Sequence, residues 1–98
     1  MSEAKFTKGD WRVERFVNGN GFEIAFNEDG EVIADYVYTE PDAHLIAAAP
    51  KMYKDIEADI EWLERLAKRY AIGSYELRSI HSRIEVKRNL LAEARGEL

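Results

Sequence analysis

Short stretches within the first forty positions alternate between apolar and polar residues, which is the pattern of half-buried β strands. Phe22, Ile24 and Phe26 recur at every second position, so three large apolar side chains fall on one face of a strand. The segments NGNG (18–21) and NEDG (27–30) supply the glycine and asparagine residues that tight turns use. The pattern predicts a three-stranded antiparallel β-meander with strands at about 11–17, 22–27 and 31–38.

The third predicted strand carries apolar residues on both of its faces. Strict alternation places Val32, Ala34, Tyr36 and Tyr38 on one face and Ile33, Asp35 and Val37 on the other. Both sets contain side chains large enough to join a core. The sequence therefore leaves open which face of this strand is buried.

From Asp42 onward the period of the apolar positions becomes helical. The Asp42 carboxylate can accept backbone N–H groups at the start of a short helix, 43–49. Pro50 disfavours the helical conformation for the residue before it and suits the first turn of a new helix. We therefore expect the chain to split or bend at Pro50 and a second, strongly amphipathic helix to follow at 51–71.

Gly73 and Ser74 are a typical helix stop followed by a helix N-cap, which predicts a last helix at 75–95. However, apolar residues also recur every seven positions across this point, as in one uninterrupted heptad pattern. Either the chain turns at Gly73 and forms an antiparallel hairpin, or one long helix protrudes and must dimerise. We favour the turn. The stripe that could support an oligomer is Leu63, Tyr70, Leu77, Ile84 and Leu91.

Together these elements predict one α+β domain spanning residues 1–98. The chain has no cysteine, which excludes disulfides and thiolate zinc sites. Its first residues lack the profile of a secretory signal, and its longest apolar run is too short to cross a bilayer. We expect a cytoplasmic protein without membrane contact.

Residue types that commonly catalyse reactions or bind metals are present, but not at the spacings that such sites require. His44 and His81 fall on different predicted helices, each without a second ligand at a metal-binding spacing. No serine lies in a strand-to-helix elbow, and the NGNG segment leads into a strand where a phosphate-binding loop would lead into a helix. The sequence predicts no catalytic residue, no metal site and no cofactor, and therefore a protein that is not an enzyme.

The distribution of charge is the most unusual feature of the chain. The net charge is −5, and residues 21–42 contain seven acidic residues and no Lys or Arg. These are Glu23, Glu28, Asp29, Glu31, Asp35, Glu40 and Asp42. Such a segment repels nucleic acid and attracts a protein with a basic surface, although acidic residues also fill the solvated face of many sheets. The basic residues of the last helix are few and lack interleaved aromatics, so direct nucleic-acid binding is not expected.

The segment DAHLIAAAP, residues 42–50, resembles the "NARLIAAAPELLEAL" segment of many small phage and prophage proteins. Weaker similarity extends to FTKGDW (6–11) and GEVIAD (30–35), and the sequence departs from that pattern at His44 and Lys51. The resemblance implies a phage accessory protein in the bacterial cytoplasm. Such proteins commonly bind a host protein and inhibit or redirect it, as anti-CRISPR and anti-restriction proteins do. The alternative is a homo-oligomeric structural or regulatory phage protein built on the heptad stripe.

Overall fold

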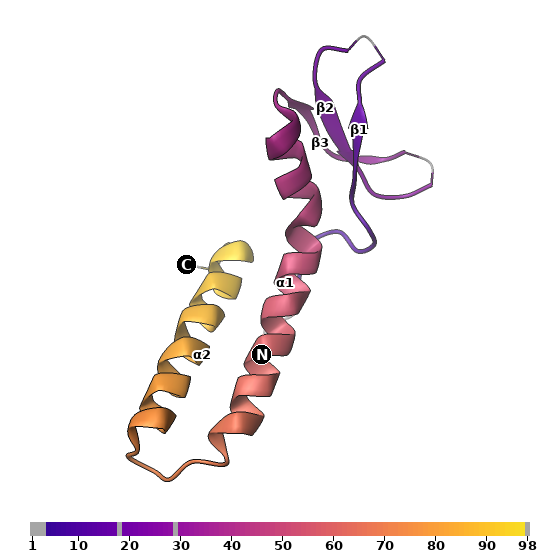
Figure 1. Cartoon of the computed structure of the whole chain (residues 1–98). Helices are drawn as coiled ribbons and strands as arrows, with labels where there is room; N and C mark the ends of the chain where they lie inside the picture. Colours follow the sequence, from indigo (N-terminus) through magenta and orange to yellow (C-terminus); the bar gives the residue numbers. More distant parts are fainter. Residues whose placement is uncertain (1–3, 18, 29, 98) are drawn as a thin grey trace. The chain divides into compact units, whose positions relative to one another are not determined.

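The computed structural model describes residues 4–17, 19–28 and 30–97, and Figure 1 shows the course of the chain. The chain forms two compact units, Met1–Met52 and Tyr53–Leu98, which are described separately below as the β unit and the hairpin unit. The prediction of a single domain stays a prediction. The predicted order of three strands followed by helices is confirmed.

The β unit contains an antiparallel sheet in the order β1-β2-β3, which confirms the predicted meander. The strands are β1 (Arg12–Arg15), β2 (Phe22–Ala25) and β3 (Val32–Val37), each shorter than its predicted range. Gly21 and Gly30 border the turns with positive φ angles of 133° and 76°, which glycine adopts without a Cβ clash. Two predicted turn residues, Asn18 and Asp29, lie outside the described residues.

The core of the β unit lies between the sheet and the first part of helix α1 (Glu40–Ala67). Phe22 and Ile24 of β2 and Ala43 of α1 are its buried members. Around them pack Trp11, Val13, Ile33, Ala34, Val37, Ile46 and Ala47. The alanine-rich start of α1 thus has a structural reason: small side chains let the helix backbone approach the sheet closely.

Strand β3 does not follow a single alternation, because extra residues interrupt its pairing with β2. Phe22 pairs with Val37 whereas Ile24 pairs with Ala34, so three steps along β3 match two along β2. The adjacent residues Ile33 and Ala34 therefore both pack toward the core. This bulge resolves the question left open by the sequence: the buried set combines residues from both alternating faces.

Helix α1 corrects the predicted break at Pro50. One continuous helix runs from Glu40 to Ala67 with Pro50 inside it, where separate helices at 43–49 and 51–71 were expected. Proline removes one N–H donor from the helical ladder, but this cost does not end the helix where strong helix formers and a packed apolar face continue on both sides. The helix also ends four residues early, because the hydrogen bonds at residues 68–70 tighten to an i→i−3 pattern.

The hairpin unit confirms the turn at Gly73 and excludes the single long helix. Gly73 has a φ of 84°, and the Ser74 hydroxyl accepts a hydrogen bond from the Leu77 N–H at 3.1 Å at the start of α2 (Tyr75–Ala94). The second half of α1 and α2 then run antiparallel (Figure 1). Their buried contact residues are Tyr53, Ile60, Leu63, Ile80, Ile84 and Leu91.

Replacing Ser74 with alanine should destabilise the protein by about 1 kcal/mol, because the first turn of α2 loses the acceptor for its free N–H. Urea denaturation followed by circular dichroism measures this change. Ser79→Ala is the matched control, since Ser79 is exposed within α2 and alanine is the better helix former there. Equal stability losses in both variants would show that Ser74 does not act as a cap.

Within the described part of the chain, no helix combines the length and apolarity needed to span a membrane.

Candidate partner-binding surface

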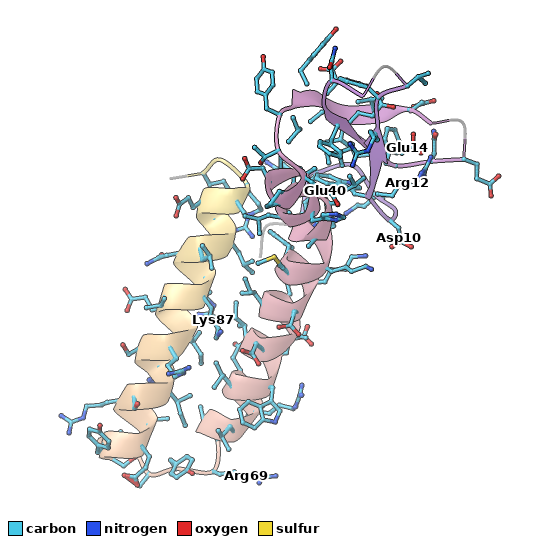
Figure 2. The ribbon with its side chains drawn as sticks, turned by 45° about the horizontal axis from the view of Figure 1, so that its top comes forward. Asp10, Arg12, Glu14, Glu40, Arg69 and Lys87 are labelled. Carbon is cyan, nitrogen blue, oxygen red and sulfur yellow. The ribbon has the colours of Figure 1, made fainter. Side chains whose placement is uncertain are left out.

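The outer face of the sheet, turned away from the core, carries charged side chains in register. Arg12 and Glu14 alternate with core-facing Val13 on β1, and Glu14 pairs directly with Glu23 on β2. Arg12 Nε lies 2.8 Å from Glu14 Oε1, so this arginine compensates one of the two facing carboxylates (Figure 2). Two facing carboxylates, Glu14 and Glu23, repel each other. Because Arg12 compensates only one of them, the face attracts a further cation.

An aromatic pair extends this face at the end of the strands. The rings of Phe16 and Tyr36 meet edge to face, with centroids 5.3 Å apart and an interplanar angle of 66°. A Cβ atom at Gly21 would lie 3.4 Å from the Phe16 ring, so the ring covers the backbone of that glycine. The pair therefore joins the residue after β1 to β3, over the glycine that precedes β2.

Tyr36 is held in an uncommon backbone conformation. Its φ is +56°, which is sparsely populated for residues with bulky side chains and costs about 1–3 kcal/mol. Tyr36 lies within the β3 bulge, and its side chain is 67% exposed.

The structure spreads the predicted acidic residues over three places. Glu23 lies on β2, Asp35 lies on β3, and Glu28 and Glu31 lie in the connection between these strands. Glu40 and Asp42 lie in the first turn of α1, where negative charge is favourable for the helix dipole. Asp29 lies outside the described residues. The prediction of one partner-binding acidic surface stays untested.

Sequence reasoning missed the arginines that strand pairing brings beside this acidic segment. Arg15 Nη2 lies 3.3 Å from Glu40 Oε1, and its guanidinium carbon lies 4.8 Å from the centre of the Phe22 ring. His44 Nε2 lies 3.2 Å from the other Glu40 oxygen. Within the described residues, Glu23, Glu28, Glu31, Asp35 and Asp42 take part in no ion pair and remain free for a partner.

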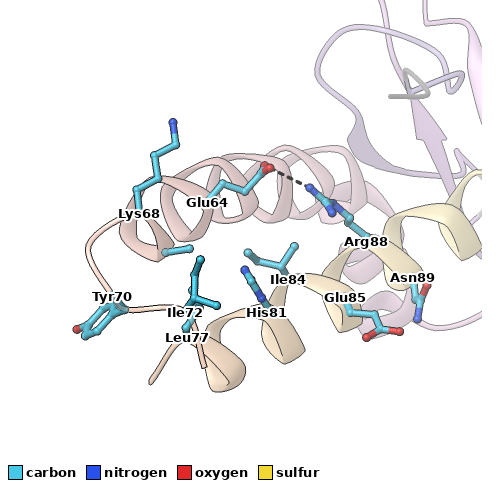
Figure 3. A pocket seen from close by; sticks show the side chains of 11 residues that line it. Glu64, Lys68, Tyr70, Ile72, Leu77, His81, Ile84, Glu85, Arg88 and Asn89 are labelled. Atoms are coloured by element: carbon cyan, nitrogen blue, oxygen red, sulfur yellow. Dashed lines mark hydrogen bonds and ion pairs between the residues drawn. The ribbon is translucent and has the colours of Figure 1, made fainter. Parts of the chain in front are cut away.

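The hairpin unit has an open groove of about 840 Å³ beside the turn between its helices (Figure 3). Ala67, Leu77 and Ile84 provide its apolar floor, while Glu64 and Arg88 cross one side as an ion pair of 2.9 Å. His81 also lines it. Among the described residues, no group of three or more metal-ligating side chains occurs, here or elsewhere.

The opposite end of the hairpin unit is fixed by Arg95, just after α2. Its Nη1 donates a hydrogen bond of 2.8 Å to the hydroxyl of buried Tyr53, and its Nε lies 3.0 Å from a Glu97 oxygen. The hydrogen bond to Tyr53 raises the pKa of Arg95 above its usual value, although burial opposes this, and Glu97 adds to it. This contact ties the end of α2 to α1.

The predicted oligomer stripe lies largely inside this unit. Leu63, Ile84 and Leu91 are 5–6% exposed and pack between the two helices of one chain. Leu77 is half-buried and only Tyr70, in the connection, is exposed. A second copy could reach the three buried leucine and isoleucine side chains only if the hairpin opened.

The fold and the surface together define a small α+β protein with exposed acidic and aromatic groups. The family described as Salmonella phage P22 protein Y8K6 matches residues 1–98, and the chain belongs to this family. It is therefore a phage protein, as the resemblance of residues 42–50 implied. Comparison with curated proteins and with solved structures gave no match.

Proposed function

We propose that this chain is a non-enzymatic phage accessory protein that binds a host protein with a basic surface through its β unit. The supporting observation is the division of charge between the two units. Residues 1–52 contain ten acidic and five basic residues, and residues 53–98 contain nine of each. The β unit thus carries the entire net charge of −5, and its field steers basic partners toward the sheet.

The outer face of the sheet supplies short-range contacts to accompany that field. The Phe16–Tyr36 pair offers an exposed ring to a lysine or arginine side chain, which aromatic faces attract. Glu23 adds a carboxylate on β2, and Asp35 adds one next to Tyr36 on β3. A partner that inserts a cation between these groups gains both interactions, and proteins that handle nucleic acid present such cations in their binding grooves.

The proposed target is accordingly a nucleic-acid-handling or defence factor of the host. The chain would inhibit or redirect this factor in the bacterial cytoplasm, as anti-CRISPR and anti-restriction proteins do with their targets. Acidic side chains that take no part in ion pairs mimic the charge of a nucleic-acid backbone, so the phage protein would occupy the groove in place of nucleic acid. No cofactor and no metal are needed for this role.

Affinity purification from lysate of the natural host, with mass spectrometry, tests the proposal. The tagged protein should retain one host protein with a basic surface, and reversal of Glu23, Glu28, Glu31 and Asp35 to lysine should abolish its retention. The matched control reverses Glu61, Glu76, Glu85 and Glu93, four exposed acids of the hairpin unit, and should retain the same protein. Retention that survives the first set of reversals would overturn the proposal.

The alternative, a homo-oligomer assembled on the heptad stripe, stays a prediction. Leu63, Ile84 and Leu91 of that stripe are buried within one chain, so an oligomer that uses them would require the hairpin to open.

A further inference from the structure

The hairpin unit exposes as many large apolar side chains as it buries. Six are buried between the helices: Tyr53, Ile60, Leu63, Ile80, Ile84 and Leu91. Six others are exposed: Trp62, Tyr70, Ile72, Tyr75, Val86 and Leu90. Two helices cover one another along a single line only, so apolar residues beyond that line stay exposed unless a further layer covers them.

Two ion pairs distinguish the two sides of this hairpin. Asp59 Oδ2 lies 3.0 Å from Lys87 Nζ, and Glu64 Oε2 lies 2.9 Å from Arg88 Nη2. Glu64 follows Asp59 by five residues, which rotates it to the other side of α1. The Glu64–Arg88 pair crosses the groove side (Figure 3), whose rim is polar, so the Asp59–Lys87 pair marks the opposite side.

That opposite side collects exposed apolar residues from both helices. Trp62 and Leu66 follow Asp59 by three and seven positions, and Leu90 follows Lys87 by three, so all lie on the side that the ion pair marks. Trp62 is 52% exposed and Leu90 is 48% exposed. We call this surface the Trp62 face; it comprises Asp59, Trp62, Leu66, Arg83, Lys87 and Leu90.

We propose that a second copy of this chain docks on the Trp62 face, so that two hairpins form an antiparallel four-helix bundle. The charge of the unit supports this occupant. Residues 53–67 of α1 hold five acidic and two basic residues, whereas α2 holds three acidic and four basic. With the two-fold axis parallel to the helices, α1 of each copy lies across α2 of the other, so the acidic helix meets the basic one twice.

The same charges make a different occupant less suitable. The Trp62 face carries Asp59 as well as Arg83 and Lys87, so a partner with a surface of one sign meets repulsion from one of the two helices. The hairpin unit is also neutral, with nine residues of each sign, so two hairpin units do not repel one another through net charge. This dimer stands independently of the proposed function, which uses the β unit.

Sedimentation equilibrium of the full chain, from low to high micromolar concentration, tests the dimer. The molar mass should rise from 11.3 kDa toward twice that value. Trp62→Glu and Leu90→Glu should each weaken the dimer by about tenfold or more, because each places a charge within the buried contact. Ile72→Glu is the matched control: Ile72 is 98% exposed in the connection between the helices, and this variant should dimerise as the unmodified chain does.

Circular dichroism separates loss of the dimer from loss of the fold. Both side chains are about half exposed, so the two glutamate variants should keep their helical signal; if either loses it, Trp62→Gln or Leu90→Gln takes its place. A chain that stays monomeric at every concentration overturns the inference. A dimer that is insensitive to substitution at both positions also overturns it, because the contact then lies elsewhere.

Discussion

Replacement of Ile24 by alanine is expected to destabilise the protein by about 2–5 kcal/mol. Ile24 is 0% exposed and is the largest fully buried side chain among the described residues. It packs with the buried residues Phe22 and Ala43 in the core between the sheet and α1. Because natural domains are stable by only about 5–15 kcal/mol, this change should remove a large part of what holds the sheet against α1.

Urea denaturation measures the loss, with near-ultraviolet circular dichroism as the probe of packing around Trp11 in the same core. Val17→Ala is the control, because Val17 is fully exposed and its truncation should change the free energy of unfolding by no more than about 0.5 kcal/mol. If Ile24→Ala is as mild as Val17→Ala, the core is not organised around β2. Loss of the core should also disrupt the outer face of the sheet, since Phe16 and Tyr36 are positioned by the same sheet.

The sequence predicted those features that depend on a few consecutive residues, such as turns, helix caps and the face of a strand. The Gly73–Ser74 stop and cap and the positive φ at Gly21 and Gly30 all follow from properties of single residues. The period-two pattern at 22–26 also identified Phe22 and Ile24 as core residues, whereas Phe26 lies beyond β2 and is half-buried. These features needed no knowledge of which segments pair.

Features that depend on pairing could not be predicted in the same way. The inward face of β3 is decided by a bulge, which shifts the register by a residue and includes Tyr36. The approach of Arg15 to Glu40 joins residues 25 positions apart. A window of sequence shows only the charges of one segment, so the segment 21–42 did not reveal that Arg15 lies beside Glu40.

The heptad stripe is a second feature whose packing partner could not be predicted from the sequence. Seven-residue spacing arises in a coiled coil, but it also arises when two helices of ordinary period are joined by a connection of suitable length. The turn at Gly73 makes Leu63, Ile84 and Leu91 intrachain partners. Sequence spacing identified residues that pack against helices, and only the turn decides to which chain those helices belong.

Replacement of Pro50 by alanine is expected to stabilise the protein by about 1–3 kcal/mol. Pro50 occupies the eleventh position of a 28-residue helix, far inside α1. Proline is about 3 kcal/mol less favourable than alanine in a helix interior, because it has no N–H to donate and its ring crowds the preceding turn. The side chain is buried, so the smaller alanine loses some packing, which sets the lower end of the range.

Thermal and urea unfolding of Pro50→Ala measure the gain, and Pro41→Ala is the matched control. Pro41 lies in the first turn of the same helix, where proline needs no N–H partner and its fixed φ suits the helix, so its replacement should give no stabilisation. A stabilising Pro50→Ala with a neutral or destabilising Pro41→Ala would confirm that α1 continues through Pro50. If Pro50→Ala instead destabilises the protein as much as a core truncation does, proline is required for a kink or a contact that alanine cannot provide. That result would contradict a regular, continuous α1.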